Sequence, residues 1–238
     1  MDGLAAARPL SSGRAMIVLE VFVTGGTGYI GRPLINSLRR RGHAVSALAR
    51  EASVRRVPKW VRCVVGNALD ATSYLERVPR GATLVHLVGT PHPSPAKAKA
   101  KAKEFQSIDL ASVRAALQAA QDADVAHFVY LSVAHPAPVM HAYVAARREA
   151  EQKIRDSGIP ATFLRPWYVL GPGHRWPYLL LPAYWLAERL PASRETATRL
   201  GLVSRAQMVA ALVEAVEMPP QGLRVVEVPQ IRQTKKLR

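Results

Sequence analysis

Apolar and polar positions follow two periods along the chain, which predicts strands that alternate with helices. Short, nearly continuous apolar runs are typical of strands that are buried on both faces. Their alternation with helix-length segments predicts an α/β fold of the Rossmann type, a doubly wound parallel sheet with helices on both faces. The predicted strands are 17–23, 44–49, 61–65, 82–88, 125–132 and 160–165, and the predicted helices are 29–41, 70–78, 105–121 and 140–157.

The pattern changes after Pro166, where an aromatic, proline-punctuated segment begins. We expect a short strand over 197–203 and a last strand over 223–228. Between them, Ser204 with Gln207 three residues on predicts a capping box at the start of a helix. These elements would complete the sheet after an irregular, aromatic region.

The elements predict a single domain over residues 16–238, preceded by a flexible tail at 1–15. Its Rossmann core would extend to about residue 166, and residues 167–230 would form a small C-terminal lobe on the substrate side and complete the core. The chain has 238 residues, which is enough for a sizeable core. No stretch reaches the ~20 apolar residues of a membrane span. Nothing in the sequence indicates an oligomeric state.

The composition is strongly basic, with a formal net charge of +16. Such a charge attracts anions: nucleotides, nucleic acid or an acidic membrane surface. An arginine-rich composition with solvated basic loops explains it equally simply, and we favour this interpretation. The lysines at 97–103 lie in a low-complexity stretch of an expected exposed loop at 92–103, without interleaved aromatic residues, and no nucleic-acid-binding motif occurs, which argues against nucleic acid as a partner.

The single Cys63 excludes an internal disulfide framework and fits a reducing, cytoplasmic compartment. No set of His, Cys, Asp and Glu residues has the spacing of metal ligands, so we expect no metal.

A cluster of glycines, "VTGGTGYIGR" at 23–32, follows the first predicted strand and opens the first predicted helix. Gly25 would permit a tight turn, Gly28 the approach of a pyrophosphate, and Gly31 close packing of helix on strand. The free N–H groups at the start of the helix favour phosphate, and Thr24 and Thr27 add hydroxyl donors. A plain turn would not need three glycines in register, so the segment predicts a dinucleotide site.

Arg50 ends the second predicted strand, where the adenosine ribose is expected. A guanidinium there pairs with a 2′-phosphate, whereas an acidic residue would favour NAD. Glu51 follows at once and weakens the distinction. The preferred cofactor is therefore NADP(H), with NAD(H) as the alternative.

Two further strand ends carry candidate cofactor contacts. Asn67, with the backbone of Ala68, would hydrogen-bond the adenine edge, or Asn67 would simply cap the following helix. Val88 and Gly89 would line the central part of the cofactor, because a glycine lets a ligand approach the backbone.

Several motifs in this order resemble the short-chain dehydrogenase/reductase superfamily. They are "TGGTGYIG", "GNALD", "HLVG", "YLSV", a tyrosine with a cation four residues on, and "FLRPWYVLGPG". The chain looks most like the atypical branch, the NmrA-like and complex I 39-kDa-subunit-like NAD(P)-binding proteins, over residues 17 to 230.

The resemblance implies roles for individual cofactor-site residues. In the family, the pyrophosphate loop is formed by the positions that match Gly25, Thr27, Gly28, Tyr29, Ile30 and Gly31. The position that matches Arg50 selects the 2′-phosphate, and those that match Asn67 and Ala68 contact adenine. The positions that match Pro166 and Val169 lie beside the nicotinamide.

The resemblance also implies a catalytic set of Ser132, Tyr143 and Arg147. Tyr143 would donate a proton to a carbonyl oxygen, Ser132 would hydrogen-bond that oxygen, and Arg147 would orient the nicotinamide ribose. Active members usually carry lysine in place of Arg147. Arginine can lower the pKa of a neighbouring tyrosine but does not relay a proton.

Two functions fit this sequence. One is an NAD(P)H-dependent oxidoreductase that transfers hydride to a carbonyl, a quinone or a similar small apolar acceptor. The other is a non-catalytic NAD(P)H-binding redox sensor, assembly factor or accessory subunit. The aromatic segment after Pro166 fits an apolar substrate pocket, a protein-binding patch, a shallow peripheral membrane contact or a lid packed on the core.

Overall fold

The computed structural model describes residues 17–90, 102–172, 179, 181–187 and 189–234. The flexible tail expected at 1–15 and most of the lysine-rich loop expected at 92–103 lie outside these residues. Part of the aromatic segment, 173–178, also lies outside them.

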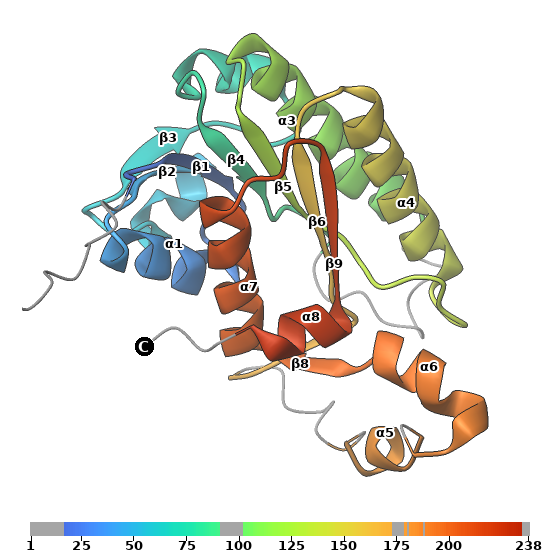
Figure 1. Ribbon diagram of the computed structural model, residues 1–238. Coiled ribbons are helices and arrows are strands. Elements are labelled where there is room, and N and C mark those ends of the chain that lie inside the picture. The colour runs from blue at the N-terminus through green and yellow to red at the C-terminus, as the bar shows by residue number, and fades with distance from the viewer. Residues whose placement is uncertain (1–16, 91–101, 173–178, 180, 188, 235–238) are drawn as a thin grey trace, which may run out of the picture.

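Within the described part of the chain, seven parallel strands form the central sheet, in the order β3-β2-β1-β4-β5-β6-β9 (Figure 1). The strand order reverses between β1 and β4, and ligands of such sheets bind at this switch point, outside the carboxyl ends of the strands. The predicted doubly wound Rossmann-type fold is confirmed. The strands are β1 (Glu20–Thr24), β2 (Ala44–Ala49), β3 (Arg62–Val65), β4 (Thr83–His86), β5 (His127–Leu131), β6 (Ala161–Arg165) and β9 (Leu223–Glu227).

Helices cover both faces of the sheet, because its apolar strands are buried on both sides (Figure 1). Val21 and Val23 of β1 pack into the core that contains α1 (Gly31–Arg40) and α7 (Arg205–Glu217). Phe22, between them, packs into a second core with α3 (Ala111–Asp122) and α4 (His141–Asp156). Alternate side chains of β1 therefore pack into two separate hydrophobic cores, one on each face of the sheet.

The segment predicted as one helix at 70–78 is instead two single turns of 3₁₀ helix, η2 (Ala71–Ser73) and η3 (Leu75–Arg77). The Asp70 carboxylate accepts hydrogen bonds from the backbone N–H and the hydroxyl of Thr72. The Ser73 hydroxyl donates to the carbonyl of Asp70. Such local bonds offer the backbone an alternative to a continuous helix.

The predicted strand at 197–203 is also wrong over most of its length. Pro191 opens a helix there, α6 (Pro191–Arg199), as proline does at a first helical position. Only β8 (Leu202–Ser204) is extended, and it pairs with β7 (Tyr168–Leu170). The predicted capping box of Ser204 and Gln207 is confirmed at the start of α7.

Further elements complete the described chain. They are η1 (Glu51–Arg56), α2 (Ala102–Glu104), the π-helical segment η5 (Phe105–Leu110), α5 (Leu181–Ala187) and α8 (Val228–Gln233). Figure 1 shows α5, α6, α8 and β8 gathered at the carboxyl edge of the sheet. Among the described helices, none has both the length and the apolar character that crossing a membrane requires.

Candidate functional site

The glycine loop between β1 and α1 lies at the switch point of the sheet. Gly25 has a φ of +74°, and its carbonyl accepts a hydrogen bond from the N–H of Gly28 at 3.0 Å. A β-carbon on Gly31 would overlap the carbonyl oxygen of Gly25 and would lie 2.7 Å from Cα of Gly26. The loop therefore folds back on the first turn of α1 so closely that a side chain at Gly31 has no room.

Gly28 differs from these two glycines because space lies in front of it. A β-carbon there would meet only the carbonyl oxygen of Gly25, at 3.2 Å, and the residue is exposed. A hollow of about 430 Å³ opens beside the loop. It is lined by Thr27, Gly28, Tyr29, Arg32, Pro33, Asn36 and Arg205.

Two arginines of this hollow were not singled out from the sequence. Arg32 belongs to the first turn of α1, and the guanidinium of Arg205 lies over the ring of Tyr29, with its central carbon 4.9 Å from the ring centroid. Because Arg205 comes from the start of α7, only the fold brings it to the loop. Together with the helix N-terminus, the two guanidinium groups make the hollow favourable for an anion.

Thr24 does not offer its hydroxyl to this hollow, contrary to expectation. It is fully buried, and its Oγ1 lies 2.9 Å from Nδ1 of His86. Thr27 remains half-buried at the hollow.

The candidate adenosine-binding residues lie at the ends of two neighbouring strands. Arg50 is exposed and directly follows β2. Asn67 follows β3, and its Oδ1 accepts a hydrogen bond from the N–H of Leu69 at 3.1 Å. Asn67 therefore caps the following turn in this structure, as the alternative interpretation expected. Among the described hydrogen bonds, none involves the side-chain NH₂ of Asn67. Ala68 packs against the core of α3.

A second group of polar residues centres on Arg147, which is almost fully buried. Its Nη2 lies 2.6 Å from Oδ1 of Asp109, and its Nη1 donates to the carbonyl of Leu131 at 2.8 Å and to the hydroxyl of Tyr130 at 3.2 Å. Arg147 thus joins α4 to η5 and to the end of β5.

Gly89 makes room for this guanidinium. A β-carbon on Gly89 would overlap Nη2 of Arg147 and would lie 3.0 Å from Oδ1 of Asp109. Val88, just before it, is half-buried after β4. Gly89, which the sequence analysis assigned to the approach of the cofactor, therefore leaves space that the guanidinium of Arg147 occupies.

Sequence reasoning missed Asp109. Its carboxylate has no exposed surface, and its Oδ2 accepts hydrogen bonds from the N–H and the hydroxyl of Thr90. It lies in the π-helical turn η5, a type of irregularity that is frequent at functional sites. The available signal was an acidic residue on the apolar face of a predicted helix.

Tyr143 lies beside this ion pair. Its ring centroid is 5.1 Å from that of Phe105 and 5.2 Å from the guanidinium carbon of Arg147. Burial raises the pKa of Tyr143, and the charge of Arg147, which lowers it, does not compensate. Tyr143 is therefore protonated at neutral pH, as a proton donor must be.

Ser132 belongs to a second polar group, centred on Glu151, which lies one helical turn after Arg147 on the same face of α4. Its hydroxyl is buried and donates to Oε1 of Glu151 at 2.6 Å. Arg165 binds the same carboxylate through two bonds of 2.9 and 2.5 Å, and binds Glu227 at 2.8 Å. A hydroxyl has one proton, so Ser132 must turn away from Glu151 before it can donate to a substrate.

The carboxylate of Glu151 is held in its charged form. Burial alone would raise its pKa, but the hydrogen bonds from Arg165 and Ser132, together with the nearby ring of His135, whose Nε2 lies 3.6 Å from Oε2, outweigh burial and lower the pKa to about 2. A carboxylate with so low a pKa is a weak base. It orients the Ser132 hydroxyl without removing its proton.

The two residues expected beside the nicotinamide lie at the carboxyl edge, near the start of the lobe. The carbonyl of Pro166 accepts a hydrogen bond from the N–H of Ala134 at 2.9 Å. Val169 is half-buried in β7, opposite Val203 of β8.

His86 is a buried, neutral histidine beneath this site. Its Nδ1 lies 2.9 Å from the hydroxyl of Thr24 and its Nε2 lies 3.1 Å from the hydroxyl of Ser112. Burial, together with the positive charge of Arg147, lowers the pKa of His86 from 6.5 to about 3. The folded protein therefore does not take up a proton at His86 at mildly acidic pH, whereas the unfolded chain does.

We expect the contribution of His86 to the free energy of unfolding to be fully present above pH 6.5 and to be lost progressively as the pH drops toward about 3. The slope is about 1.4 kcal/mol per pH unit for one such histidine. Burial of His127, whose pKa falls to about 4, adds a second contribution. Urea denaturation at about pH 7 and about pH 5 measures the slope, and His86→Asn should remove one histidine's share. If the free energy of unfolding of His86→Asn changed with pH as steeply as that of the wild type, His86 would not be the cause of the pH dependence.

The family model described as NAD(P)H-binding matches residues 25–219, which span the glycine loop, η5 and α4. The chain belongs to this NAD(P)H-binding family. The resemblance to atypical short-chain dehydrogenases/reductases is thereby confirmed, while the NmrA-like and complex I-like branches stay predictions.

Among curated proteins, the chain is 29% identical to a ceramide reductase of Caulobacter vibrioides over 220 residues. The match covers 89% of this chain and 65% of that protein, so the chain spans less than two thirds of this relative.

Among solved structures, the fold is similar to that of the UDP-glucose 4-epimerase of Thermus thermophilus in complex with NAD. The TM-score is 0.64 at 19% identity, over 90% of this chain and 81% of the epimerase. A short-chain dehydrogenase/reductase superfamily protein of Agrobacterium tumefaciens with bound NAD gives a TM-score of 0.62 at 17% identity, over 87% and 77% of the two chains. These likenesses concern the fold.

Proposed function

We propose that this NAD(P)H-binding family member is a reductase that transfers hydride to a carbonyl, a quinone or a similar small apolar acceptor, with NADP(H) preferred over NAD(H). The observation that carries the cofactor part of the proposal is the open face of Gly28 at the switch point of the sheet. The catalytic part depends on Tyr143 beside the buried guanidinium of Arg147. The name of the ceramide reductase relative supports a reduction.

The residues present fit a dinucleotide. The open backbone at Gly28 leaves room for a diphosphate, and the N-terminus of α1 with Arg32 and Arg205 would bind its charge. Arg50, at the end of β2, would bind a 2′-phosphate. When bound, the reduced nicotinamide supplies a hydride.

On the protein side, the reaction would depend on Tyr143. Its hydroxyl is protonated at neutral pH and would donate that proton to the oxygen of the acceptor. Burial, which raises its pKa, makes it a weaker acid than a free tyrosine, so the donation depends on the charge of Arg147. Arg147 is held by Asp109 and would stabilise the tyrosinate that forms. Ser132 would assist the oxygen after turning away from Glu151.

The non-catalytic alternative, an NAD(P)H-binding sensor or accessory subunit, is favoured by two specific contacts. The proton of Ser132 already goes to Glu151, and the charge of Arg147 is already paired with Asp109. A protein that binds the dinucleotide without reducing an acceptor would keep both contacts unchanged.

Gly28→Ala tests the shared requirement of both functions, which is a dinucleotide at the loop. We expect affinity for NADPH to fall by at least about tenfold, because the new methyl group occupies the space through which a phosphate approaches. Stability should fall slightly, since the new β-carbon would lie 3.2 Å from the carbonyl oxygen of Gly25, a tight contact that only a small shift of the loop relieves. Calorimetric titration with NADPH measures the first effect and urea denaturation the second.

Gly222→Ala is the matched control, because a β-carbon there meets open space. It should change neither quantity. Unchanged NADPH affinity in Gly28→Ala would contradict the placement of the diphosphate.

Arg50→Ala tests the cofactor preference. Loss of a charge-assisted contact should weaken NADPH binding by roughly 10- to 100-fold, while NADH binding should stay as it is. Titration of both cofactors into the wild type, Arg50→Ala and the exposed control Arg62→Ala gives the comparison. Parallel losses for the two cofactors would rule out selection of a 2′-phosphate by Arg50.

A further inference from the structure

Several large apolar side chains in and next to α5 are exposed and close together in sequence, and we call this part of the lobe the α5 tip. It consists of Leu179, Trp185, Leu186, Arg189 and Leu190. The four apolar side chains of this set are 83%, 58%, 53% and 50% exposed, in chain order. Side chains of this size and exposure, gathered in a dozen residues, are typical of an interaction surface.

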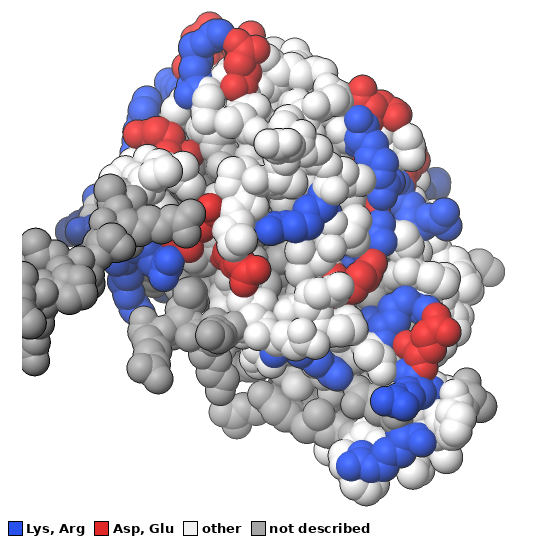
Figure 2. Space-filling view, viewed as in Figure 1, with Lys and Arg blue, Asp and Glu red and all other residues white. Residues whose placement is uncertain are grey.

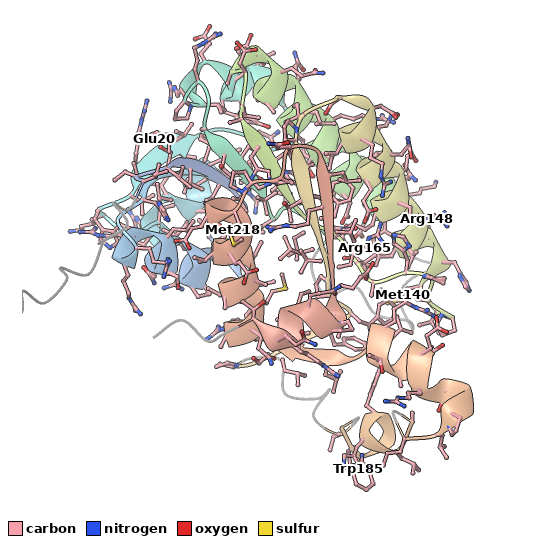
Figure 3. All side chains as sticks on the ribbon, viewed as in Figure 1. Glu20, Met140, Arg148, Arg165, Trp185 and Met218 are labelled. Atoms are coloured by element: carbon pink, nitrogen blue, oxygen red, sulfur yellow. The ribbon has the colours of Figure 1, made fainter. Side chains whose placement is uncertain are left out.

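The α5 tip is a projection and not a groove. Figure 1 shows α5 as the helix farthest from the central sheet, and Figure 3 shows Trp185 at its outer end, directed away from the molecule. A groove would suit a peptide or a helix of a partner, because its walls would bury the partner's side chains. Apolar side chains on a convex end fit the interfacial layer of a membrane, which they can enter without a preformed pocket.

Basic groups accompany the apolar ones. The guanidinium carbon of Arg189 lies 3.5 Å from the ring centroid of Trp185, and its Nη1 donates to the carbonyl of the same residue at 2.9 Å. Arg194 follows on α6 and is exposed. Figure 2 shows basic side chains next to uncharged surface over this end of the molecule, with acidic side chains among them.

Trp and Leu beside Arg have the composition of a membrane-interface contact. Indole rings favour the level of the lipid headgroups, and an arginine can stay at that level while its stem and the neighbouring rings enter the apolar layer. The net charge of +16 makes the chain complementary to an anionic surface.

We propose that the α5 tip docks on the surface of a membrane that contains anionic lipids, with Trp185 and Leu186 entering its interfacial layer. This proposal goes beyond the cofactor site and does not depend on it.

Vesicle co-sedimentation tests the proposal without NADPH, so its outcome is independent of the cofactor site. The full chain is mixed with vesicles of phosphatidylcholine alone, or with vesicles in which phosphatidylglycerol replaces part of it. We expect binding to the anionic vesicles, weaker binding at high salt, and little binding to the neutral ones. The double variant Trp185→Ser/Leu186→Ser should bind anionic vesicles at least about tenfold more weakly.

Trp60→Ser is the matched control, because Trp60 is also an exposed tryptophan, 43% exposed, with the guanidinium carbon of Arg39 lying 4.2 Å from its ring centroid. It should bind vesicles like the wild type. A protein with this charge can adhere to anionic vesicles by electrostatics alone; in that case both variants would bind as the wild type does, and the proposal would be overturned.

Two other results would also overturn it. One is the absence of binding to anionic vesicles. The other is a concentration-dependent dimer of the lipid-free protein that the double variant abolishes, since the α5 tip would then contact a second copy. Circular dichroism melts of all variants establish that each is folded, which the exposure of the substituted side chains favours.

Discussion

Replacing Asp109 by alanine is expected to lower the free energy of unfolding by about 3–5 kcal/mol. The substitution leaves the guanidinium of Arg147 buried without its carboxylate, because Arg147 is only 7% exposed at its side chain. It also removes the acceptor of the Thr90 N–H and hydroxyl. The remaining bonds of Arg147 go to the neutral groups of Tyr130 and Leu131, which do not balance a charge. Urea denaturation near neutral pH measures the loss.

Arg80→Ala is the control for this prediction. Arg80 and Asp124 also form an ion pair, but both side chains are more than two thirds exposed, at 74% and 72%. Removing an exposed pair costs less than about 1 kcal/mol. If Asp109→Ala were no less stable than Arg80→Ala, the Asp109–Arg147 pair would not stabilise the junction of η5 and α4.

Tyr143→Phe is expected to lower the turnover of NADPH with an acceptor by about 10²- to 10⁴-fold, the usual contribution of a general acid. The phenyl ring keeps the contacts with Phe105 and Arg147, so the fold and the binding of NADPH should persist. Only the proton donor is lost. Steady-state oxidation of NADPH with a panel of quinones, aldehydes and ketones measures turnover, and calorimetry measures cofactor binding.

Tyr74→Phe serves as its control. Tyr74 is buried and stacks on Phe22, with ring centroids 6.0 Å apart, on the η2–η3 side of the sheet. Its loss of a hydroxyl should not affect turnover. Full activity in Tyr143→Phe would exclude Tyr143 as the acid. Tight binding of NADPH by the wild type without turnover of any acceptor would support the non-catalytic alternative.

The sheet and the glycine loop were predictable because each is specified by residues close in sequence. A strand buried on both faces leaves an apolar run, and the turn at Gly25 requires a residue that tolerates a φ of +74°. The two 3₁₀ turns η2 and η3 could not be predicted from the sequence, because their structure depends on whether Asp70 and Ser73 form hydrogen bonds with the local backbone. Composition alone does not decide that competition.

The candidate catalytic residues show where a sequence motif stops being informative. The spacing of Tyr143 and Arg147 correctly places both on α4, where the ring and the guanidinium are neighbours. It says nothing of Asp109, since that carboxylate comes from η5 and meets Arg147 only after the helices pack. Likewise, the partner of Ser132 lies 19 residues away, and only the fold directs its proton to Glu151.

The last strand has a consequence for shortened forms of the chain. β9 pairs along the whole of β6, whose residues are buried and mostly apolar. A chain that stopped after α7 would leave β6 as a bare, hydrophobic margin with unpaired N–H and C=O groups. Such a margin recruits strands from other molecules, so C-terminal truncation would yield aggregates before it yielded a smaller folded protein.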